Sequence, residues 1–235
     1  MAASDFPLFG DPSSAPNDPP AASGREVPPP GPTRAEVLTA VEARLLATFG
    51  EPSGRAAVTF LGAEKIEVLR FGPDADGLVR YTTLGMAAAP MADPTAVVAD
   101  PVRGPRAELV LTLRGGRDEV LRALAVFAAT PQVEGLVVAP GSSLDLGEPL
   151  WPGAPFTSVL VGEGGMGVPP AEGWGMVEDL ELPEPAEAVR FLPLLPMTPN
   201  EAAHKRVRGA AELQERWLAH GTDLRDPQRR GVPLD

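Results

Sequence analysis

Hydrophobic positions first follow a regular pattern at Thr33, directly after a proline-rich stretch. Hydrophobic residues then recur at helical intervals, at Leu38, Val41, Leu45 and Phe49. Thr33 and Glu36 have the spacing of a capping box, in which each side chain accepts a hydrogen bond from the backbone N–H of the other residue. Gly50 follows the last hydrophobic position, as is common at the end of a helix. The pattern predicts an amphipathic helix between Thr33 and Gly50.

Three runs rich in Val, Ile, Leu, Phe, Tyr and Thr come next and predict strands. They cover residues 57–61, 65–71 and 78–84. Residues 72–77 hold glycine, proline and aspartate, and these turn-forming residues predict an antiparallel hairpin between the second run and the third. The third strand is expected to end at Gly85, because glycine takes backbone angles that other residues resist.

The chain after Gly85 contains further short hydrophobic runs. Strands are predicted at residues 107–113, 136–139, 156–161 and 188–195. A helix over residues 118–129 is expected to end before Pro131. Pro193 and Pro196 place the end of the last strand at a sheet edge or a bulge, because proline has no N–H to give to the ladder.

The last predicted helix begins at Thr198, with Pro199 at its first position and Glu201 at capping-box spacing. It is expected to run to about His220. Its inward positions are Val207, Ala210, Leu213 and Trp217.

Strands that come in pairs as well as between helices indicate an α+β fold, with a mixed, largely antiparallel sheet packed with helices in a single domain. We assign this domain to residues 33–220. Residues 1–32 hold nine prolines and few large hydrophobic residues, so they are predicted to be a disordered tail. Residues 221–235 are predicted to be a polar C-terminal tail.

Charge and composition narrow the function. The chain has 32 acidic and 20 basic residues, a formal net charge of -12, which repels a phosphate backbone, so nucleic-acid binding is not expected. It has no cysteine, which excludes disulfides and cysteine nucleophiles and fits a reducing compartment. No signal peptide and no apolar run of membrane-spanning length are visible. We expect a cytoplasmic protein that does not bind membranes.

Three patterns resemble reactive sites, and each has a simpler explanation. Residues 162–167 match G-x-G-x-x-G, but Pro169 follows where dinucleotide binding needs a helix, so a surface loop is expected. His204 and His220 lie on different faces of one predicted helix and cannot share a metal ion. Residues 141–143 form a serine-containing turn without a histidine partner. No catalytic residue, cofactor or metal site is predicted.

Residues 172–187, which we call the acidic segment, carry six carboxylates and no basic residue. Trp174 and several aliphatic residues lie between the acids, in the manner of interface centres ringed by charge. The residues predicted to bind a partner are Trp174, Glu178, Asp179, Glu181 and Glu184. In the alternative interpretation, Trp174 and the aliphatic residues fold back onto the core and the acids face water.

Three stretches in order resemble the Suppressor of Fused family. They are Thr83-Leu84-Gly85-Met86, Glu108-Leu109-Val110-Leu111, and Leu194-Leu195-Pro196-Met197-Thr198 with Glu201 behind it. The family has a Thr-Leu-Gly-Met-Ser-like turn, a Glu-Leu-Val-Leu-like strand and a Leu-Leu-Pro-Met-Thr-x-x-Glu-like entry into a last helix. The likeness covers roughly residues 34 to 218. Ala87 stands where the family pattern favours serine.

The resemblance implies a domain that binds proteins and has no enzymatic activity. Animal members bind and restrain transcription factors, and many bacterial members resemble immunity proteins that neutralise toxins. We therefore expect a bacterial immunity protein whose acidic face binds a basic toxin. A regulatory or scaffold protein with another target is an alternative, and a hydrolase that uses the carboxylates between residues 162 and 187 is a further one.

Overall fold

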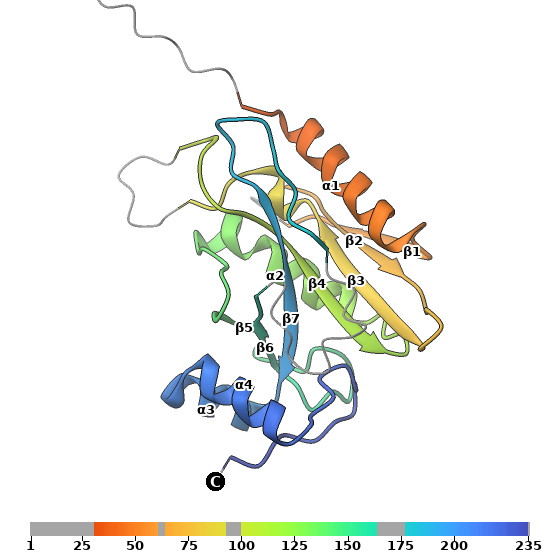
Figure 1. The fold of residues 1–235 in the computed structure, drawn as a ribbon, viewed down its shortest axis with the longest axis vertical. Coiled ribbons are helices and arrows are strands. Elements are labelled where there is room, and N and C mark those ends of the chain that lie inside the picture. Colours follow the sequence, from red (N-terminus) through yellow and green to blue (C-terminus); the bar gives the residue numbers. More distant parts are fainter. Residues whose placement is uncertain (1–30, 61–63, 93–99, 164–176, 235) are drawn as a thin grey trace, which may run out of the picture.

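The computed structural model describes residues 31–60, 64–92, 100–163 and 177–234. Within them the chain forms a seven-stranded sheet and four α-helices (Figure 1). The predicted α+β class is therefore confirmed. Most of the predicted N-terminal tail lies outside the described residues, as do Trp174 and most of the G-x-G-x-x-G pattern.

Neighbouring strands lie in the order β1-β2-β3-β4-β7-β6-β5. The strands are β1 (Gly54–Val58), β2 (Ile66–Phe71), β3 (Leu78–Leu84), β4 (Arg106–Arg114), β5 (Ser143–Asp145), β6 (Ser158–Val161) and β7 (Val189–Met197). The helices are α1 (Arg34–Phe49), α2 (Val120–Glu134), α3 (Pro199–Arg208) and α4 (Ala210–Ala219). All strand pairs are antiparallel except β4 with β7. The mixed, largely antiparallel sheet and the β2–β3 hairpin are both confirmed.

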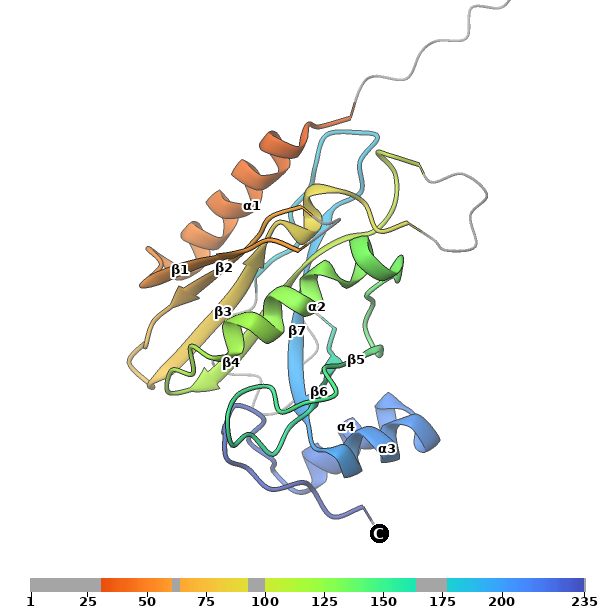
Figure 2. The ribbon, with the colours of Figure 1, turned by 180° about the vertical axis from the view of Figure 1, so that it is seen from behind.

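Alternate side chains of the strands point to opposite faces of the sheet, so each face packs against a different helix. On β2, Val68 belongs to the hydrophobic cluster of α2, and its neighbour Leu69 belongs to that of α1. Figures 1 and 2 show α1 on one face of the sheet and α2 on the other, with α3 and α4 at the end of β7. The capping box of α1 is present, since Thr33 N–H donates to Glu36 Oε2 at 2.7 Å.

The expected end of α2 and the strand after it were both wrong. α2 continues through Pro131 to Glu134. Proline removes one helical N–H, but Gly135, in the left-handed conformation with φ 68°, donates its N–H to Pro131 O at 3.1 Å and closes the last turn. Residues 136–139 form no strand. There the backbone N–H of Val138 donates to Met91 Sδ at 3.3 Å, so the segment packs on the core without a strand partner.

The proline-bearing end of the last strand was predicted to lie at a sheet edge or a bulge. β7 as a whole lies inside the sheet, between β4 and β6, but its end pairs with β6 alone. The strand changes partners along its length. Its first half, up to Pro193, pairs with β4, and its second half pairs with β6. Pro193 therefore lies where the ladder with β4 ends. Pro196 lies opposite Val159 of β6, and its carbonyl accepts a hydrogen bond from Arg229 Nη2 at 2.5 Å.

The single helix expected after Thr198 is two helices. Gly209, with φ 94° and ψ 165°, leaves the helical region and separates α3 from α4. Leu213 and Trp217 are buried as expected. Val207 was expected to face inward, but it is 81% exposed, because the break at Gly209 turns α4 onto the core and leaves the end of α3 in solvent.

The segment predicted as a polar tail, residues 221–235, packs on the sheet up to residue 234. Its buried residues include Leu224, Arg225, Arg229 and Val232. The backbone N–H of Arg114, at the end of β4, donates to Arg225 O at 2.8 Å. The tail prediction fails because charged residues were expected to face solvent. Here Arg229 is buried and donates to the buried acceptors Glu201 and Pro196 O.

Candidate protein-binding surface

A buried glutamate of β4 holds the turn that follows β3. The side chain of Glu108 accepts hydrogen bonds from Thr83 Oγ1 at 2.6 Å, from Gly85 N–H at 2.8 Å and from Ala87 N–H at 3.0 Å. Gly85 has φ 139°, and a Cβ there would lie 2.9 Å from Lys65 O. Only glycine fits this position. The first two of the three stretches that resemble the family are thus one structural unit.

Ala87 is fully buried in this unit. Besides its N–H bond to Glu108, its carbonyl accepts a hydrogen bond from Arg106 Nη1 at 2.8 Å. Both of its backbone groups are therefore used inside the domain. A partner cannot reach this position without opening the turn.

A second buried glutamate, Glu201, organises the third stretch. Thr198 N–H donates to its Oε2 at 2.8 Å, which completes the capping box of α3. Trp217 Nε1 of α4 donates to Oε1 at 2.9 Å, and Val232 N–H does so at 3.1 Å. Arg229 Nη1 forms an ion pair with Oε1 at 2.7 Å. One carboxylate of α3 thus joins the start of its own helix to α4 and to the C-terminal segment.

Arg229 also lies over two aromatic rings. Its guanidinium carbon is 4.9 Å from the ring centre of Phe156 and 5.6 Å from that of Trp217. Such contacts stabilise a cation that has lost its water. Burial alone raises the pKa of Glu201, but the hydrogen bond and charge of Arg229, with further donors, hold the pKa of Glu201 below its usual value.

Glu108 and Glu201 are expected to give opposite pH dependence of stability. Burial raises the pKa of Glu108 above the usual 4.5, and the hydrogen bonds that its side chain accepts lower this pKa by less than burial raises it. The stability that Glu108 contributes is therefore fully present below the pKa of the unfolded state. It is lost as the pH rises through the pKa of the folded state. The pKa of Glu201 is lowered, so its contribution is complete above the usual pKa and is lost as pH falls through the folded value.

Urea unfolding of the wild type, Glu108→Gln and Glu201→Gln between about pH 3 and about pH 8 measures this difference. The stability gap between wild type and Glu108→Gln should narrow as pH rises. The gap for Glu201→Gln should narrow as pH falls. If both gaps moved in the same direction with pH, the assignment of the two pKa shifts would be wrong.

The structure also shows where the metal-ligating residue types and the two histidines lie. No group of three or more His, Asp or Glu there could hold a metal ion. The side chain of His204 is only 11% exposed, and its Nε2 lies 3.7 Å from Glu212 Oε1 of α4. His220 is the C-cap of α4. In the same part of the chain, no helix has the length and apolar character needed to cross a membrane.

The described part of the acidic segment is held firmly on the domain. Val177 is buried, and Leu180 and Leu182 pack on the hydrophobic cluster beneath α1. Leu180 and Val189 exchange two backbone hydrogen bonds, of 2.9 and 2.8 Å. These aliphatic residues therefore fold back onto the core, as in the alternative interpretation. Trp174 lies outside the described residues.

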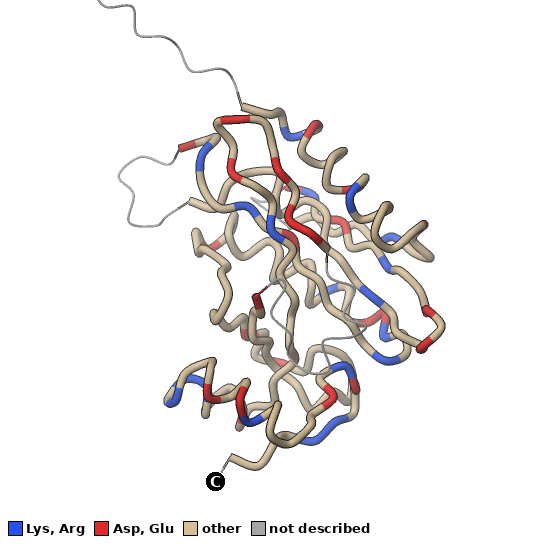
Figure 3. Tube along the Cα trace, viewed as in Figure 1, with Lys and Arg blue, Asp and Glu red and all other residues tan. Residues whose placement is uncertain are grey.

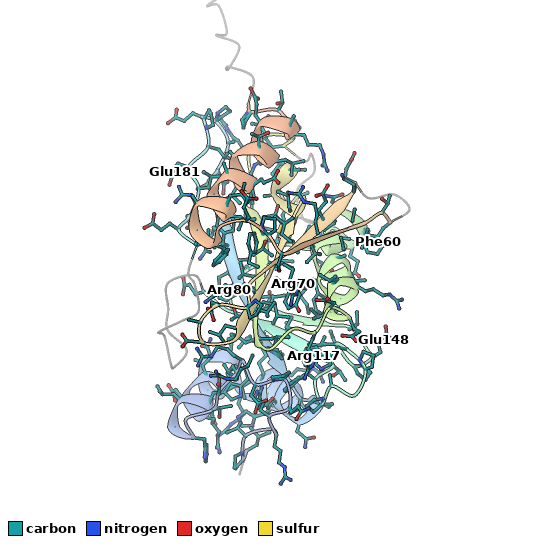
Figure 4. All side chains as sticks on the ribbon, turned by 90° about the vertical axis from the view of Figure 1, so that its right-hand side faces the viewer. Phe60, Arg70, Arg80, Arg117, Glu148 and Glu181 are labelled. Carbon is teal, nitrogen blue, oxygen red and sulfur yellow. The ribbon has the colours of Figure 1, made fainter. Side chains whose placement is uncertain are left out.

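The carboxylates of this segment point into solvent on an ordered backbone. Glu178, with its side chain 91% exposed, lies 3.3 Å from Arg44 Nη1 of α1, and Asp179 lies 4.0 Å from Arg190 Nε. Among the described residues Glu181 and Glu184 form no ion pair. Figure 3 shows the acidic residues in red along this segment, and Figure 4 shows Glu181 at the outer edge beside α1. The structure thus brings the four described candidates together on one exposed strip.

Comparison with protein families decides the identity. The model of the family described as Suppressor of fused protein (SUFU) matches residues 62–230. The chain belongs to the SUFU family. The match includes Arg229 and most of the segment expected to be a tail. The SUFU domain therefore contains the ion pair between Arg229 and Glu201. A search of curated proteins gave no match.

Solved SUFU structures share the fold. A SUFU homolog from Neisseria gonorrhoeae FA 1090 is 18% identical, with a TM-score of 0.60 over 84% of this chain and 97% of its own. The Sufu–Fu complex gives 12% identity and a TM-score of 0.57, over 88% of this chain and 93% of that chain. Drosophila Suppressor of Fused is 12% identical, with a TM-score of 0.55 over 88% of this chain. This chain spans 52% of the Drosophila chain.

The buried partners of the SUFU motifs were missed from the sequence. Glu108 was noted only as part of a motif, Glu201 only as part of a motif and as a capping-box acid, and Arg229 was placed in a tail. A signal existed for Glu108, which lies within an otherwise apolar strand where a charge requires partners. For Arg229 there was none, because its contacts are with residues far away in the chain.

Proposed function

We propose that this SUFU chain is a non-enzymatic binding protein whose acidic segment docks on a basic surface of another protein. The observation that carries the proposal is the strip of exposed carboxylates at Glu178, Asp179, Glu181 and Glu184 on an anchored backbone. A fixed set of charges attracts an opposite surface from a distance and loses little side-chain and backbone freedom on docking. The solved Sufu–Fu complex supports protein binding as the activity of the family.

Within this role we propose an immunity protein that neutralises a basic toxin. The net charge of -12 supports such a partner, because oppositely charged proteins associate faster than neutral ones. A cytoplasmic location follows from the same proposal, since an immunity protein protects the cell that makes its toxin. A regulatory complex with another basic protein would use the same strip.

A hydrolase that uses these carboxylates is the less favoured function. Acid–base catalysis requires two carboxyl groups whose environments separate their pKa values. Glu178, at 91% exposure, has water around it, as have Glu181 and Glu184. Active sites shield their reacting groups from water, and these exposed side chains are not shielded.

Neutralising the strip is expected to slow association with the basic partner. The variant Glu178→Gln/Asp179→Asn/Glu181→Gln/Glu184→Gln should lower the association rate about tenfold or more at low salt, because steering by opposite charges is lost. Its rate should also depend less on salt. Surface plasmon resonance with the purified partner, at two ionic strengths, measures both effects.

A matched control removes the same charge elsewhere. Glu119, Glu134, Glu148 and Glu215 are exposed and form no ion pair among the described residues. Their fourfold replacement by glutamine should change the association rate much less. If both variants slowed association equally, net charge would be the cause and the strip would not be the binding surface. Lost catalytic turnover in the first variant, with binding intact, would favour the hydrolase.

A further inference from the structure

The outer end of α3 carries positive charge on a chain that is negative as a whole. Lys205, Arg206 and Arg208 lie in its last turn, and Val207 among them is 81% exposed. We call these four residues the basic tip. α3 ends here at Gly209, and Figure 3 shows Lys and Arg in blue at the outer end of the α3–α4 pair. The tip is therefore accessible.

Neighbouring carboxylates do not neutralise the basic tip. Lys205 and Arg206 form no ion pair in the part of the chain that the structure describes. Arg208 has a long contact, 3.5 Å from its Nε to Glu212 Oε1, and that same oxygen lies 3.7 Å from Arg216 Nη2. One carboxylate oxygen thus serves two arginines. The tip keeps a net positive charge.

The helix itself explains only part of this arrangement. Cations are favoured at the C-terminus of a helix, where the carbonyl ends carry negative partial charge. This attraction accounts for the three cations, but it does not account for the exposed side chain of Val207 among them. An apolar group at the centre with charges at the rim is the arrangement of a docking point, in which the apolar group enters a pocket of the partner.

We propose that the basic tip is a second docking surface, which binds an acidic segment of a partner protein that has an apolar pocket for Val207. An anionic membrane or nucleic acid fits less well. Both are extended polyanions, and the rest of this chain, with its net charge of -12, is repelled by them over the Debye length of about 8 Å. A short acidic protein segment contacts the tip alone and avoids most of that repulsion.

This inference goes beyond the proposed function and does not depend on it. The acidic segment lies beside α1, and α3 lies at the far end of β7 (Figure 1). Partners of opposite charge can therefore bind at the same time. A chain with both surfaces in use joins a basic protein to an acidic one.

NMR titration of the full-length protein tests the tip. The probe is a short synthetic peptide of glutamates around one leucine, and its all-glutamine analogue is the control. Amide shifts are expected at Lys205 to Arg208. The variant Lys205→Gln/Arg206→Gln/Arg208→Gln should weaken binding at least about tenfold, and Val207→Ser several-fold. Arg206, Val207 and Arg208 are exposed, and Lys205 is half-buried without an ion pair among the described residues, so the variants should fold.

The matched control is Arg103→Gln/Arg122→Gln/Arg230→Gln, which removes three exposed positive charges outside the tip. It should leave the affinity within about twofold of the wild type. The proposal is overturned if the tip amides do not shift, if the glutamine analogue binds equally well, or if Val207→Ser has no effect. Binding of phosphatidylglycerol vesicles or duplex DNA at the tip, without binding of the peptide, would overturn it as well.

Discussion

Replacing Arg229 with alanine is expected to lower the free energy of unfolding by about 3–5 kcal/mol. The substitution leaves Glu201 charged and buried without its ion-pair partner. It also removes the donor to Pro196 O and the cation over Phe156 and Trp217. Urea unfolding followed by tryptophan fluorescence measures the loss, since Trp217 reports on this site directly.

The neighbouring arginine gives a matched control. Arg230 is exposed, and only its backbone carbonyl contacts Arg229, at 3.2 Å from Nη1. Arg230→Ala should change stability by no more than about 0.5 kcal/mol. The double variant Arg229→Ala/Glu201→Gln should lose less than the sum of the single losses, because no charge is left unpaired. Equal losses for Arg229→Ala and Arg230→Ala would show that the ion pair does not anchor the C-terminal segment.

Replacing Glu108 with alanine is expected to lower the free energy of unfolding by about 3 kcal/mol or more. Thr83 Oγ1 and the N–H groups of Gly85 and Ala87 would lose their acceptor in the interior, and each unsatisfied donor costs about 1–3 kcal/mol. The turn after β3 should also loosen. Thermal unfolding and amide hydrogen exchange of Gly85 and Ala87 measure the two effects.

Two further variants show whether the acceptor is the cause. Glu108→Gln keeps one carbonyl oxygen as an acceptor for the N–H groups of Gly85 and Ala87. It should therefore lose less stability than Glu108→Ala. Glu187→Ala removes an exposed carboxylate and should lie within about 0.5 kcal/mol of the wild type. Unchanged protection of Gly85 and Ala87 in Glu108→Ala would mean that the turn is held by other contacts.

Local patterns predicted local structure well in this chain. The capping boxes at Thr33 and Thr198 and the strand that ends at Gly85 are fixed by residues a few positions apart, so the sequence displays them. The interior position of β7 depends on β4 and β6, which are remote in the chain. Proline favoured an edge there, but a strand that changes partners accommodates it inside the sheet.

The candidate surface was predicted in part for the same reason. A run of acids without a basic residue is visible in sequence, and Glu178 and Glu181 are exposed as expected. The anchoring of the run by Leu180 and its ion pair with Arg44 involve distant parts of the chain. The basic tip was hidden by the assumption of one continuous helix, which turned Val207 inward.

The most direct test of the binding role is quantitative co-purification from the source cell. Tagged wild type and the variant Glu178→Gln/Asp179→Asn/Glu181→Gln/Glu184→Gln are compared at low and high salt, with mass spectrometry of the bound proteins. We predict one basic protein in near-stoichiometric amount with the wild type at low salt, strongly reduced at high salt and with the variant. Equal recovery with both proteins, or no stoichiometric partner under conditions that preserve known complexes, would contradict binding through the acidic segment.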